Sequence, residues 1–524
     1  MPKCTIDGKE LEVAPGTSVI QAAEQAGVRV PRFCYHDDLP VDGNCRMCMV
    51  EIEKFPKLQI ACGTPVSEGM VVKTQVTSEK AKEAQKNTLE FLLVNHPIDC
   101  PVCDQAGECY LQDQYMENGL HDSRTILEDK INKRKLVDIG PIMLDAERCV
   151  VCSRCIRYER EVTGTNLLEF VNRGGSTQIS TYEGGPITHE YAGNLADVCP
   201  VGALLSKDFR FKMRVWFLKE TDSICPGCST GCNITVDHRD GEAYRIRPRR
   251  NVEVNKSWLC DPGRDLYKNI APGRVTTAHR TGGAVAAPSE LLDEVVAKLQ
   301  TAGASSAFLA SPRASNEDAF TFKKLALAVG GRLDFRVGNP QDKVKVRKDQ
   351  ILQREDRHAN TQGLIDLGLG VTGVDALLAD CRAGRVQVLV LQDGAMLLDP
   401  GVAEAAKKVA YVVAMATHEG DHLAAAQAVI PAAMWVETDG TFTNFDRRVQ
   451  RFKRAFEAPG DARPRWEIGL DLLARLGKPL NAATAGDVFV EMAVETKAYA
   501  DLTHRSLGPL GRALGAPAPA QATA

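Results

Sequence analysis

Cysteine spacing constrains this chain more than any other feature. The 524 residues include 17 cysteines, and all but Cys4 and Cys381 fall, with one histidine, into four successive groups of four. In chain order, the first to fourth sets are Cys34, Cys45, Cys48 and Cys62; His96, Cys100, Cys103 and Cys109; Cys149, Cys152, Cys155 and Cys199; and Cys225, Cys228, Cys232 and Cys260. Groups of this composition indicate metal centres. Four of them in one chain suggest a relay of electrons rather than one reaction site.

The spacing favours iron–sulfur clusters over zinc. Tetrahedral sulfur ligation alone does not separate the two. The third set, however, begins with C-x2-C-x2-C and ends at Cys199-Pro200, which is the bacterial ferredoxin pattern of a [4Fe–4S] site. Structural zinc ribbons instead use two separated C-x2-C pairs. We therefore predict iron–sulfur clusters on all four sets, with a zinc-stapled scaffold as the non-enzyme alternative.

The first set follows a segment typical of a β-grasp ferredoxin. Residues 4–13 form an apolar/polar run broken at Asp7-Gly8, a favoured two-residue hairpin turn. Thr17 or Ser18 is placed to cap a helix over 19–26, which Gly27 would end. Hairpin, helix and cysteine-bearing loop together predict a [2Fe–2S] centre.

The second set contains three cysteines and needs a fourth ligand. His96 precedes Cys100 by four positions, and the C-x2-C-x5-C run that follows lacks another nearby cysteine except Cys4, which belongs to the first predicted strand. A lone histidine is more often a surface or core residue than a ligand. Here the need for a fourth ligand favours His96. A neutral imidazole in place of a thiolate would change the cluster's net charge and so its reduction potential.

Composition narrows the class of protein and its compartment. A formal net charge of −4 does not indicate the basic surface that nucleic-acid binding requires. No uninterrupted apolar stretch approaches the length of a transmembrane helix, and we expect the chain to carry no export signal. So many cysteines without export imply a reducing compartment and metal binding rather than disulfides. Any work at a membrane would be that of a peripheral subunit.

The pattern along the chain predicts a multidomain protein of α+β and α/β class. After the ferredoxin-like part, residues 78–94 have helical spacing and lead into His96. Beyond residue 275, helical stretches over 289–299 and 374–383 alternate with apolar runs over 386–391 and 409–414, as in a doubly wound parallel sheet. The Ala/Pro-rich end, 515–524, is predicted to be disordered.

We predict six segments. They are a [2Fe–2S] ferredoxin-like domain (1–78), a [4Fe–4S] domain with one histidine and three cysteine ligands (79–137), a [4Fe–4S] domain with four cysteine ligands (138–215), a [4Fe–4S] domain whose C-x2-C-x3-C-x27-C run resembles that of molybdopterin oxidoreductases (216–275), an α/β domain that resembles a truncated molybdopterin oxidoreductase (276–505) and a flexible tail (506–524).

Several motifs resemble one family. These are PRFCYH at 31–36, GNCRMC at 43–48, HPIDCPVC at 96–103 and the segment 193–204 that ends CPVGAL. With them the chain resembles the large iron–sulfur subunits of the peripheral arm of bacterial respiratory complex I, the proton-pumping NADH:quinone oxidoreductase. The fourth set resembles an extra [4Fe–4S] site of some bacterial members, and the segment 437–450 resembles one shared with formate dehydrogenases.

The resemblance implies an electron-transfer function. It implies one [2Fe–2S] and three [4Fe–4S] clusters and no molybdenum. Electrons from NADH, oxidised by flavin in a partner subunit, would pass from the first-set to the third-set and then the second-set cluster. They would leave to quinone-proximal iron–sulfur subunits, with the fourth set off this route. The chain would lie on the cytoplasmic side of the bacterial inner membrane and contact the membrane only through the complex.

Two other oxidoreductases remain as alternatives. One is the large subunit of a molybdenum or tungsten formate dehydrogenase, and the other is the electron-input subunit of an NAD-linked or iron-only hydrogenase. A formate dehydrogenase needs a cysteine or selenocysteine ligand to its metal after the fourth set, and an iron-only hydrogenase needs further cysteine motifs there, but only Cys381 occurs in that part of the chain. We expect Cys381 to be an inert thiol at the end of a helix. We identify no complete NADH or quinone site in the chain.

Four arginines lie close to cluster cysteines in the sequence. They are Arg46, Arg154, Arg157 and Arg160. Two interpretations remain open: these side chains stabilise the reduced, more negative clusters, or they are ordinary solvated surface charges.

Overall fold

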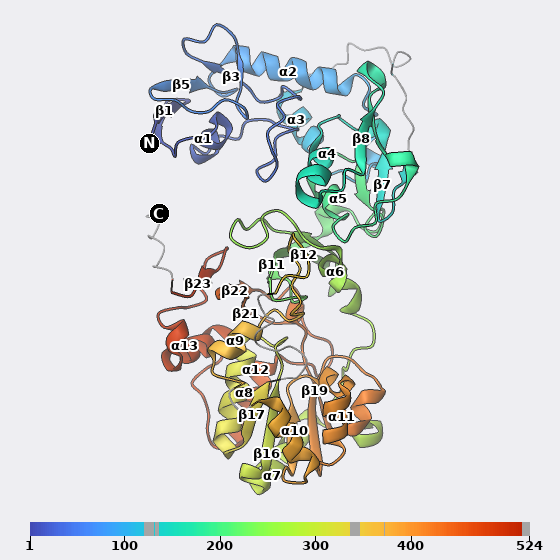
Figure 1. The fold of residues 1–524 in the computed structure, drawn as a ribbon, viewed down its shortest axis with the longest axis vertical. Coiled ribbons are helices and arrows are strands. Elements are labelled where there is room, and N and C mark those ends of the chain that lie inside the picture. Colours follow the sequence, from blue (N-terminus) through green and yellow to red (C-terminus); the bar gives the residue numbers. More distant parts are fainter. Residues whose placement is uncertain (120–129, 131–135, 336–345, 371–372, 516–524) are drawn as a thin grey trace. The chain divides into compact units, whose positions relative to one another are not determined.

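The computed structural model describes residues 1–119, 130, 136–335, 346–370 and 373–515. The chain divides into two compact units, Met1–Leu218 and Lys219–Ala524 (Figure 1). No helix in the described ranges is both long and apolar enough to span a bilayer. The predicted disordered end, 515–524, lies outside the described residues except for Gly515.

The first unit begins with a five-stranded sheet crossed by one helix. Its strand order is β2-β1-β5-β3-β4, with β1 parallel to β5 and the other pairs antiparallel. The elements are β1 (Lys3–Ile6), β2 (Lys9–Glu12), α1 (Val19–Gln25), β3 (Met49–Ile52), β4 (Gln59–Ile60) and β5 (Met70–Lys73). This is the predicted β-grasp arrangement.

The local signals in this part act as predicted. Asp7 and Gly8 both have positive φ, 48° and 83°, as a tight hairpin turn between strands requires. Ser18 forms a capping box with Gln21 at the start of α1. Gly27, with φ of 78°, follows the helix in the left-handed conformation.

The remainder of the first unit consists of short elements joined by cysteine-bearing loops. The helix predicted over 78–94 is α2 (Glu79–Leu93), capped by the Ser78 side chain. After it come α3 (Tyr110–Asn118), β6 (Leu136–Asp138), β7 (Ile142–Asp145), α4 (Arg154–Tyr158), β8 (Leu168–Val171), β9 (Gln178–Thr181), α5 (Asn194–Val198) and β10 (Leu204–Ser206). A π-helical turn, Glu159–Thr163, continues α4.

The second unit opens with an antiparallel sheet and leads into a larger, mainly parallel one. The small sheet contains β11 (Lys219–Ile224), β12 (Asn233–Arg239) and β13 (Glu242–Pro248), followed by α6 (Asp261–Arg264). The large sheet has the order β15-β14-β20-β19-β18-β16-β17. Its strands are β14 (His279–Arg280), β15 (Ala284–Val285), β16 (Ser306–Ala310), β17 (Arg332–Phe335), β18 (Val388–Leu391), β19 (Tyr411–Ala416) and β20 (Ala428–Pro431).

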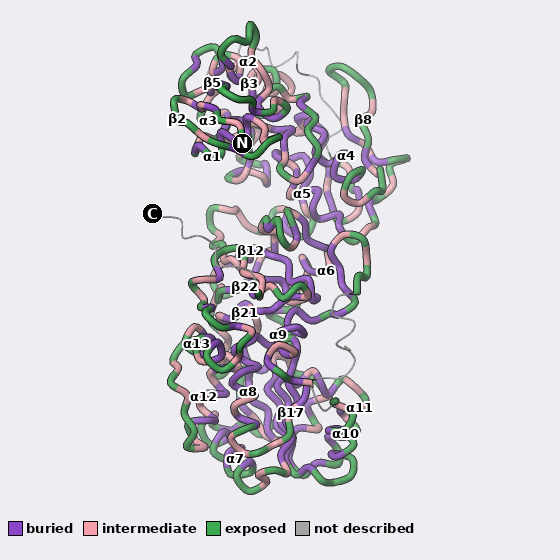
Figure 2. Tube along the Cα trace, turned by 60° about the vertical axis from the view of Figure 1, so that its left-hand side comes forward, coloured by how far each residue is buried: buried purple, intermediate pink, exposed green. Residues whose placement is uncertain are grey.

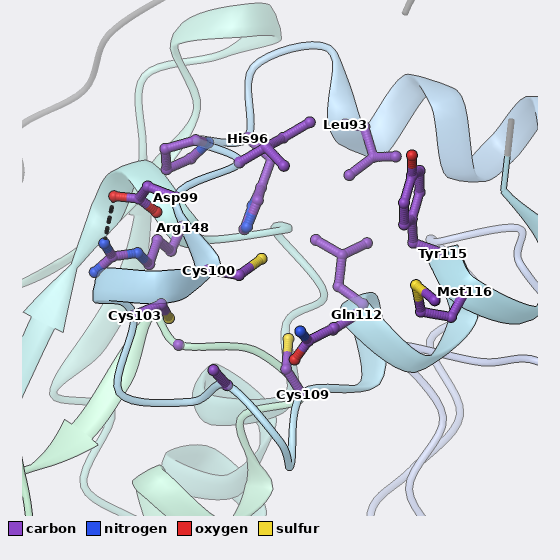
Figure 3. Close-up of a pocket in the computed structure, with 15 residues that line it drawn as sticks. Leu93, His96, Asp99, Cys100, Cys103, Cys109, Gln112, Tyr115, Met116 and Arg148 are labelled. Carbon is purple, nitrogen blue, oxygen red and sulfur yellow. Dashed lines mark hydrogen bonds and ion pairs between the residues drawn. The ribbon is translucent and has the colours of Figure 1, made fainter. Parts of the chain in front are cut away.

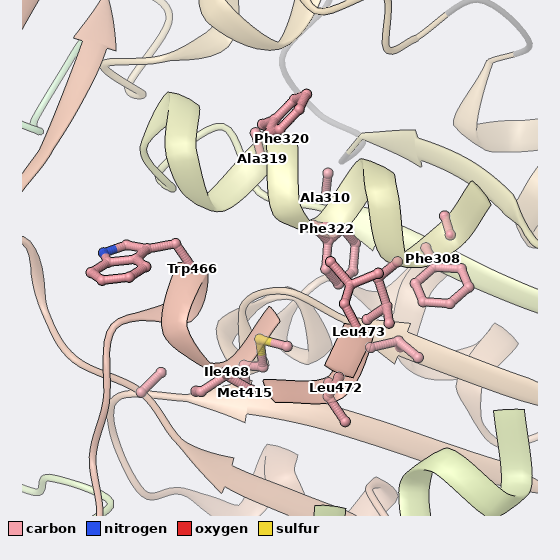
Figure 4. Close-up of a cluster of buried hydrophobic side chains, with 14 of the residues drawn as sticks. Phe308, Ala310, Ala319, Phe320, Phe322, Met415, Trp466, Ile468, Leu472 and Leu473 are labelled. Atoms are coloured by element: carbon pink, nitrogen blue, oxygen red, sulfur yellow. The ribbon is translucent and has the colours of Figure 1, made fainter. Parts of the chain in front are cut away.

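Helices cover both faces of this sheet, as the continuous apolar strands predict. Phe308 and Ala310 of β16 join the apolar cluster formed with α7 (Pro288–Ala302), α8 (Asn316–Val329), α9 (Thr361–Asp366), α12 (Arg465–Arg475) and α13 (Ala485–Glu495) (Figure 4). The alternate residues Ala307 and Leu309 face the cluster formed with α10 (Val374–Arg382) and α11 (Pro400–Ala406). Figure 2 shows the strand region as a buried layer. The doubly wound prediction is confirmed.

A third sheet closes the second unit. It contains β21 (Gly440–Thr443), β22 (Arg448–Phe452) and β23 (Arg512–Ala513). A buried bidentate ion pair between Arg274 and Glu437 ties the segment before this sheet to the start of the α/β part, with Nη2 and Oε2 2.7 Å apart.

Candidate metal centres

The first-set cysteines converge at the end of the β-grasp sheet. Cys34, Cys48 and Cys62 are each 1% exposed, and Cys45 is half-buried. The Cys34 side chain lies within hydrogen-bond reach of Cys45 and Cys62, and Cys48 lies within reach of Cys62. The backbone N–H of Cys34 also donates to Cys45 Sγ at 3.4 Å. The fold therefore brings these four side chains to one place.

The second-set residues line one cavity of about 180 Å³. His96 comes from the segment between α2 and a 3-10 turn (Cys100–Val102), Cys100 begins that turn, Cys103 ends it, and Cys109 immediately precedes α3. Figure 3 shows these four side chains around the same space. The other lining residues are mainly apolar. The cavity thus brings His96 together with the three cysteines.

Burial sets the protonation of the second set. Burial, with the charge of Arg148 beside it, lowers the pKa of His96 to about 4, so its imidazole is neutral near pH 7, the form that binds metal. Burial raises the pKa of the Cys109 thiol to about 11. Arg148 forms ion pairs with Asp99 (2.7 Å) and Asp145 (2.6 Å). Sequence analysis missed Arg148, although it directly precedes Cys149.

The third set surrounds a tight loop at the start of α4. Cys149, Cys152 and Cys155 come from this loop and helix, and Cys199 ends α5. Val151 has φ of 53°, a conformation that is strained for a β-branched residue, and its N–H donates to Cys149 Sγ at 3.3 Å. Burial, followed by the neighbouring Cys152, Cys149 and Cys199, raises the pKa of Cys155 well above its usual value. All four thiols therefore share one buried site.

The fourth set lies in the second unit, between β11, β12 and α6. The N–H of Cys225 donates to the Cys232 carbonyl at 2.8 Å, which closes the loop around Cys228. A Cβ added to Gly263 would lie 3.2 Å from Cys225 Sγ and 3.3 Å from Cys260 Sγ. The two sulfur atoms thus approach from different segments. Burial first, and then the other three thiols, raise the pKa of Cys232 well above its usual value.

Groups of buried thiols suit a polynuclear cationic core. Four thiolates in an apolar site repel one another, so the protons leave only when a metal replaces them. Within the described residues, no group of three or more His, Cys, Asp and Glu side chains is arranged to hold a single metal ion. The residues present fit iron–sulfur clusters by donor type and by convergence.

Cysteines of the first three sets belong to one apolar cluster. Cys34, Cys109 and Cys152 are buried members of it, and cysteines of the first and third sets also pack against its edge. Its remaining buried members are Phe33, Met47, Leu89, Leu111, Val150, Val201 and Ala203. These side chains exclude water from the space between the three sets.

The two remaining cysteines lie in cores. Cys4 is 3% exposed on β1, opposite Leu11 and Met70, among the apolar side chains of the β-grasp domain. It is not among the residues that line the second-set cavity. Cys381 is fully buried in α10, in the cluster behind the large sheet, and burial raises the pKa of its thiol to about 11. Its position at a helix end agrees with the prediction.

The structure separates the four arginines near the cysteines into two pairs. Arg46 and Arg160 are exposed, as solvated surface charges would be. Arg154 and Arg157 are each 4% exposed. The surface interpretation is therefore wrong for these two, because their contacts come from segments more than 40 residues away in the chain.

Comparison with known domains matches each set to one family model. The models are a 2Fe-2S iron-sulfur cluster binding domain over residues 3–77, the NADH-ubiquinone oxidoreductase-G iron-sulfur binding region over 85–124, the ferredoxin-like domain of NADH-quinone oxidoreductase subunit 3 over 140–205, and the molybdopterin oxidoreductase Fe4S4 domain over 218–272. A fifth model, molybdopterin oxidoreductase, matches 396–475.

Comparison with curated proteins finds homologues named as subunits of NADH-quinone or NADH-ubiquinone oxidoreductase. The G subunit of NADH-quinone oxidoreductase from Streptomyces coelicolor is 40% identical over 327 residues, covering 62% of this chain and 39% of that protein. The protein of the same name from Rickettsia felis is 40% identical over 340 residues (63% and 49%). The mitochondrial NADH-ubiquinone oxidoreductase 78 kDa subunit of Candida albicans is 44% identical over 276 residues (52% and 38%). The resemblance seen in the sequence is confirmed, and the chain spans less than half the length of these curated relatives.

One solved structure has a weaker likeness. It is a chain of the NAD+-reducing [NiFe]-hydrogenase in the H2-reduced state, which is 28% identical and covers 41% of this chain and 91% of its own, with a TM-score of 0.37. At that score the likeness supports no inference.

Proposed function

We propose that this chain is an electron-transfer subunit of NADH:quinone oxidoreductase. It relays electrons from NADH, oxidised by flavin in a partner subunit, toward quinone, and the whole complex couples this transfer to proton translocation. The observation that carries the proposal is the convergence of four ligand sets, each within a segment that matches an iron–sulfur domain model. The homologues at about 40% identity give the enzyme class.

The ligand assignment follows the four sets. The first set holds a [2Fe–2S] cluster and the other three each hold a [4Fe–4S] cluster, for about fourteen iron atoms per chain. When bound, the clusters supply one-electron carriers. The chain's own residues supply the ligands, exclude water through the shared apolar cluster and set the charge around each site. We expect no molybdenum.

Contacts within the first unit support the order first, third, second. Arg157 contacts the carbonyls of Cys34 and Cys152, which joins the first-set and third-set loops. Arg148, which precedes Cys149, lines the second-set cavity, and so does Gly202, which lies three residues after Cys199. The fourth set belongs to the other unit, in keeping with a site off this route.

The proposed partners follow from the enzyme class. They are the flavin- and NADH-binding subunit and the quinone-proximal iron–sulfur subunits of complex I, with no nucleic acid. The chain would be peripheral on the cytoplasmic side of the bacterial inner membrane, in contact with it only through the complex.

Substitution of His96 tests both the site and the function. His96→Cys should keep a [4Fe–4S] cluster but add one negative charge to its ligands, so its reduction potential should fall. His96→Ala should lose that cluster, and in the assembled complex NADH should still reduce the first-set and third-set clusters while quinone reduction stops. The measurement is an EPR redox titration of both variants. An unchanged midpoint and line shape for His96→Cys would show that His96 is not a ligand.

A further inference from the structure

Two buried arginines of α4 hold the first-set and third-set segments together. Arg157 donates from Nη1 to the Pro40 carbonyl, from Nη2 to the carbonyls of Cys34 and Cys152 (3.5 Å for the latter), and from Nε to Ser153 Oγ at 2.9 Å. These acceptors belong to both segments. The Arg157 guanidinium therefore holds the backbone of the first-set segment next to that of the third-set segment.

Arg154 makes a parallel set of contacts. Its Nη2 donates to the Tyr35 carbonyl at 2.5 Å and its Nη1 to the Val198 carbonyl at 3.2 Å. These residues directly follow Cys34 and precede Cys199 in the sequence. The guanidinium carbon also lies 5.6 Å from the ring centroid of Tyr110, which is within cation–π range. Arg154 thus touches neighbours of ligands from three sets.

Neither arginine has a carboxylate partner in the part of the chain that the structure describes. Among the residues that the structure describes, no Asp or Glu oxygen lies within ion-pair distance of Arg154 or Arg157, whose acceptors are carbonyls and one hydroxyl. The carboxylate of Asp42 reaches only that hydroxyl, on Ser153, and not the guanidinium of Arg157. The Nε of Arg154 is buried without a hydrogen-bond partner. Carbonyl contacts do not neutralise a buried charge, and burying an uncompensated cation is energetically unfavourable.

We propose that Arg154 and Arg157 are positioning residues that supply the counter-charge of the first-set and third-set clusters and raise the reduction potentials of both. This inference rests on the proposed function. Each cluster takes up one electron on reduction and becomes more negative, with no bond made or broken. A fixed positive charge nearby stabilises the reduced form more than the oxidised form.

Arg160, which lies outside the buried pair, provides a matched control. Arg160 follows Arg157 by three residues, as Arg157 follows Arg154, but its side chain is 55% exposed and pairs with Glu161 at 2.8 Å. The experiment is an EPR redox titration of the full chain with its clusters, poised with dithionite and mediators. It compares wild type with Arg154→Gln, Arg157→Gln, Arg154→Lys, Arg157→Lys and Arg160→Gln.

Arg154→Gln and Arg157→Gln should disfavour reduction of the first-set and third-set clusters. We expect the reduction equilibrium to shift by about tenfold, or about 59 mV for one electron. The fourth-set cluster, Arg160→Gln and the two Lys variants should stay close to wild type. Wild-type midpoints in both Gln variants would overturn the inference.

Two further outcomes also decide the question. If the Gln variants lose the first-set and third-set signals while the Lys variants keep them, a positive charge at these two positions is required for both clusters, as the proposal states. If the Lys variants lose them as well, the arginines act by shape and hydrogen bonding alone and the counter-charge proposal is wrong. Absence of iron–sulfur signals in wild type would instead refute the proposed function itself, and the inference with it.

Discussion

Gly202 is the position where one added methyl group should disturb one cluster and leave the others intact. A Cβ at this residue would lie 2.6 Å from Cys103 Sγ, 3.2 Å from Gln105 Cβ and 3.5 Å from Arg148 Cδ. The backbone of Gly202 does not require the left-handed region, so Gly202→Ala introduces crowding rather than backbone strain. A sulfur atom bound to iron cannot rotate away from the new methyl group.

The magnitude follows from the cost of overpacking. Inserting a methyl group into a filled site costs about 1–3 kcal/mol, and here the strain acts on a ligand of the second-set cluster. We expect this cluster to be held about 5- to 150-fold less tightly. The assay is the rate at which an iron chelator removes each EPR signal from the variant and from wild type.

A second glycine gives the control. In Gly227→Ala the new Cβ would lie 3.5 Å from Cys225 Sγ, an ordinary van der Waals contact beside a ligand of the fourth set. That variant should lose its clusters at the wild-type rate. If Gly202→Ala also kept the second-set signal at the wild-type rate and midpoint, Cys103 Sγ would not be fixed as a ligand and the reasoning would fail.

Three other perturbations test separate parts of the account. Cys228→Ala should reduce assembly or stability more than turnover per assembled complex, whereas complete loss of NADH:quinone activity in fully assembled complex would contradict an off-route fourth cluster. Arg274→Ala leaves the buried Glu437 carboxylate unpaired and should cost about 3–5 kcal/mol in urea unfolding, while Arg454→Ala, from an exposed pair, should change little. Burial raises the pKa of the Cys109 thiol to about 11, so a proton must leave this thiol when the cluster assembles. Protons compete with iron for the thiolate, so clusters should be lost faster at about pH 6 than at about pH 8. Equal rates of iron loss at the two pH values would contradict this linkage.

Local signals explain why much of the fold could be predicted. The Asp7-Gly8 turn, the Ser18 cap and the continuous apolar run in β18 each act through neighbours in the sequence. The four sets could be grouped for the same reason, since most of their ligands lie a few residues apart. The choice of His96 over Cys4 followed from counting ligands, and the structure adds the physical reason: Cys4 is buried in the β-grasp core.

Long-range contacts could not be predicted. Arg154 and Arg160 look alike in the sequence, and only the fold shows that one is buried and the other exposed. Arg274 and Glu437 are 163 residues apart, and no local pattern pairs them. The left-handed conformation of Val151 opposes the preference of a β-branched residue, and it arises from the loop that carries the third set.

The most direct test of the central claim is iron analysis combined with a low-temperature EPR redox titration of the purified full chain. We expect about fourteen iron atoms per chain, no molybdenum or zinc, and four separately titrating centres, one of them a [2Fe–2S] cluster. Zinc in stoichiometric amounts, a molybdenum signal, or fewer than four iron–sulfur centres in fully loaded protein would contradict it.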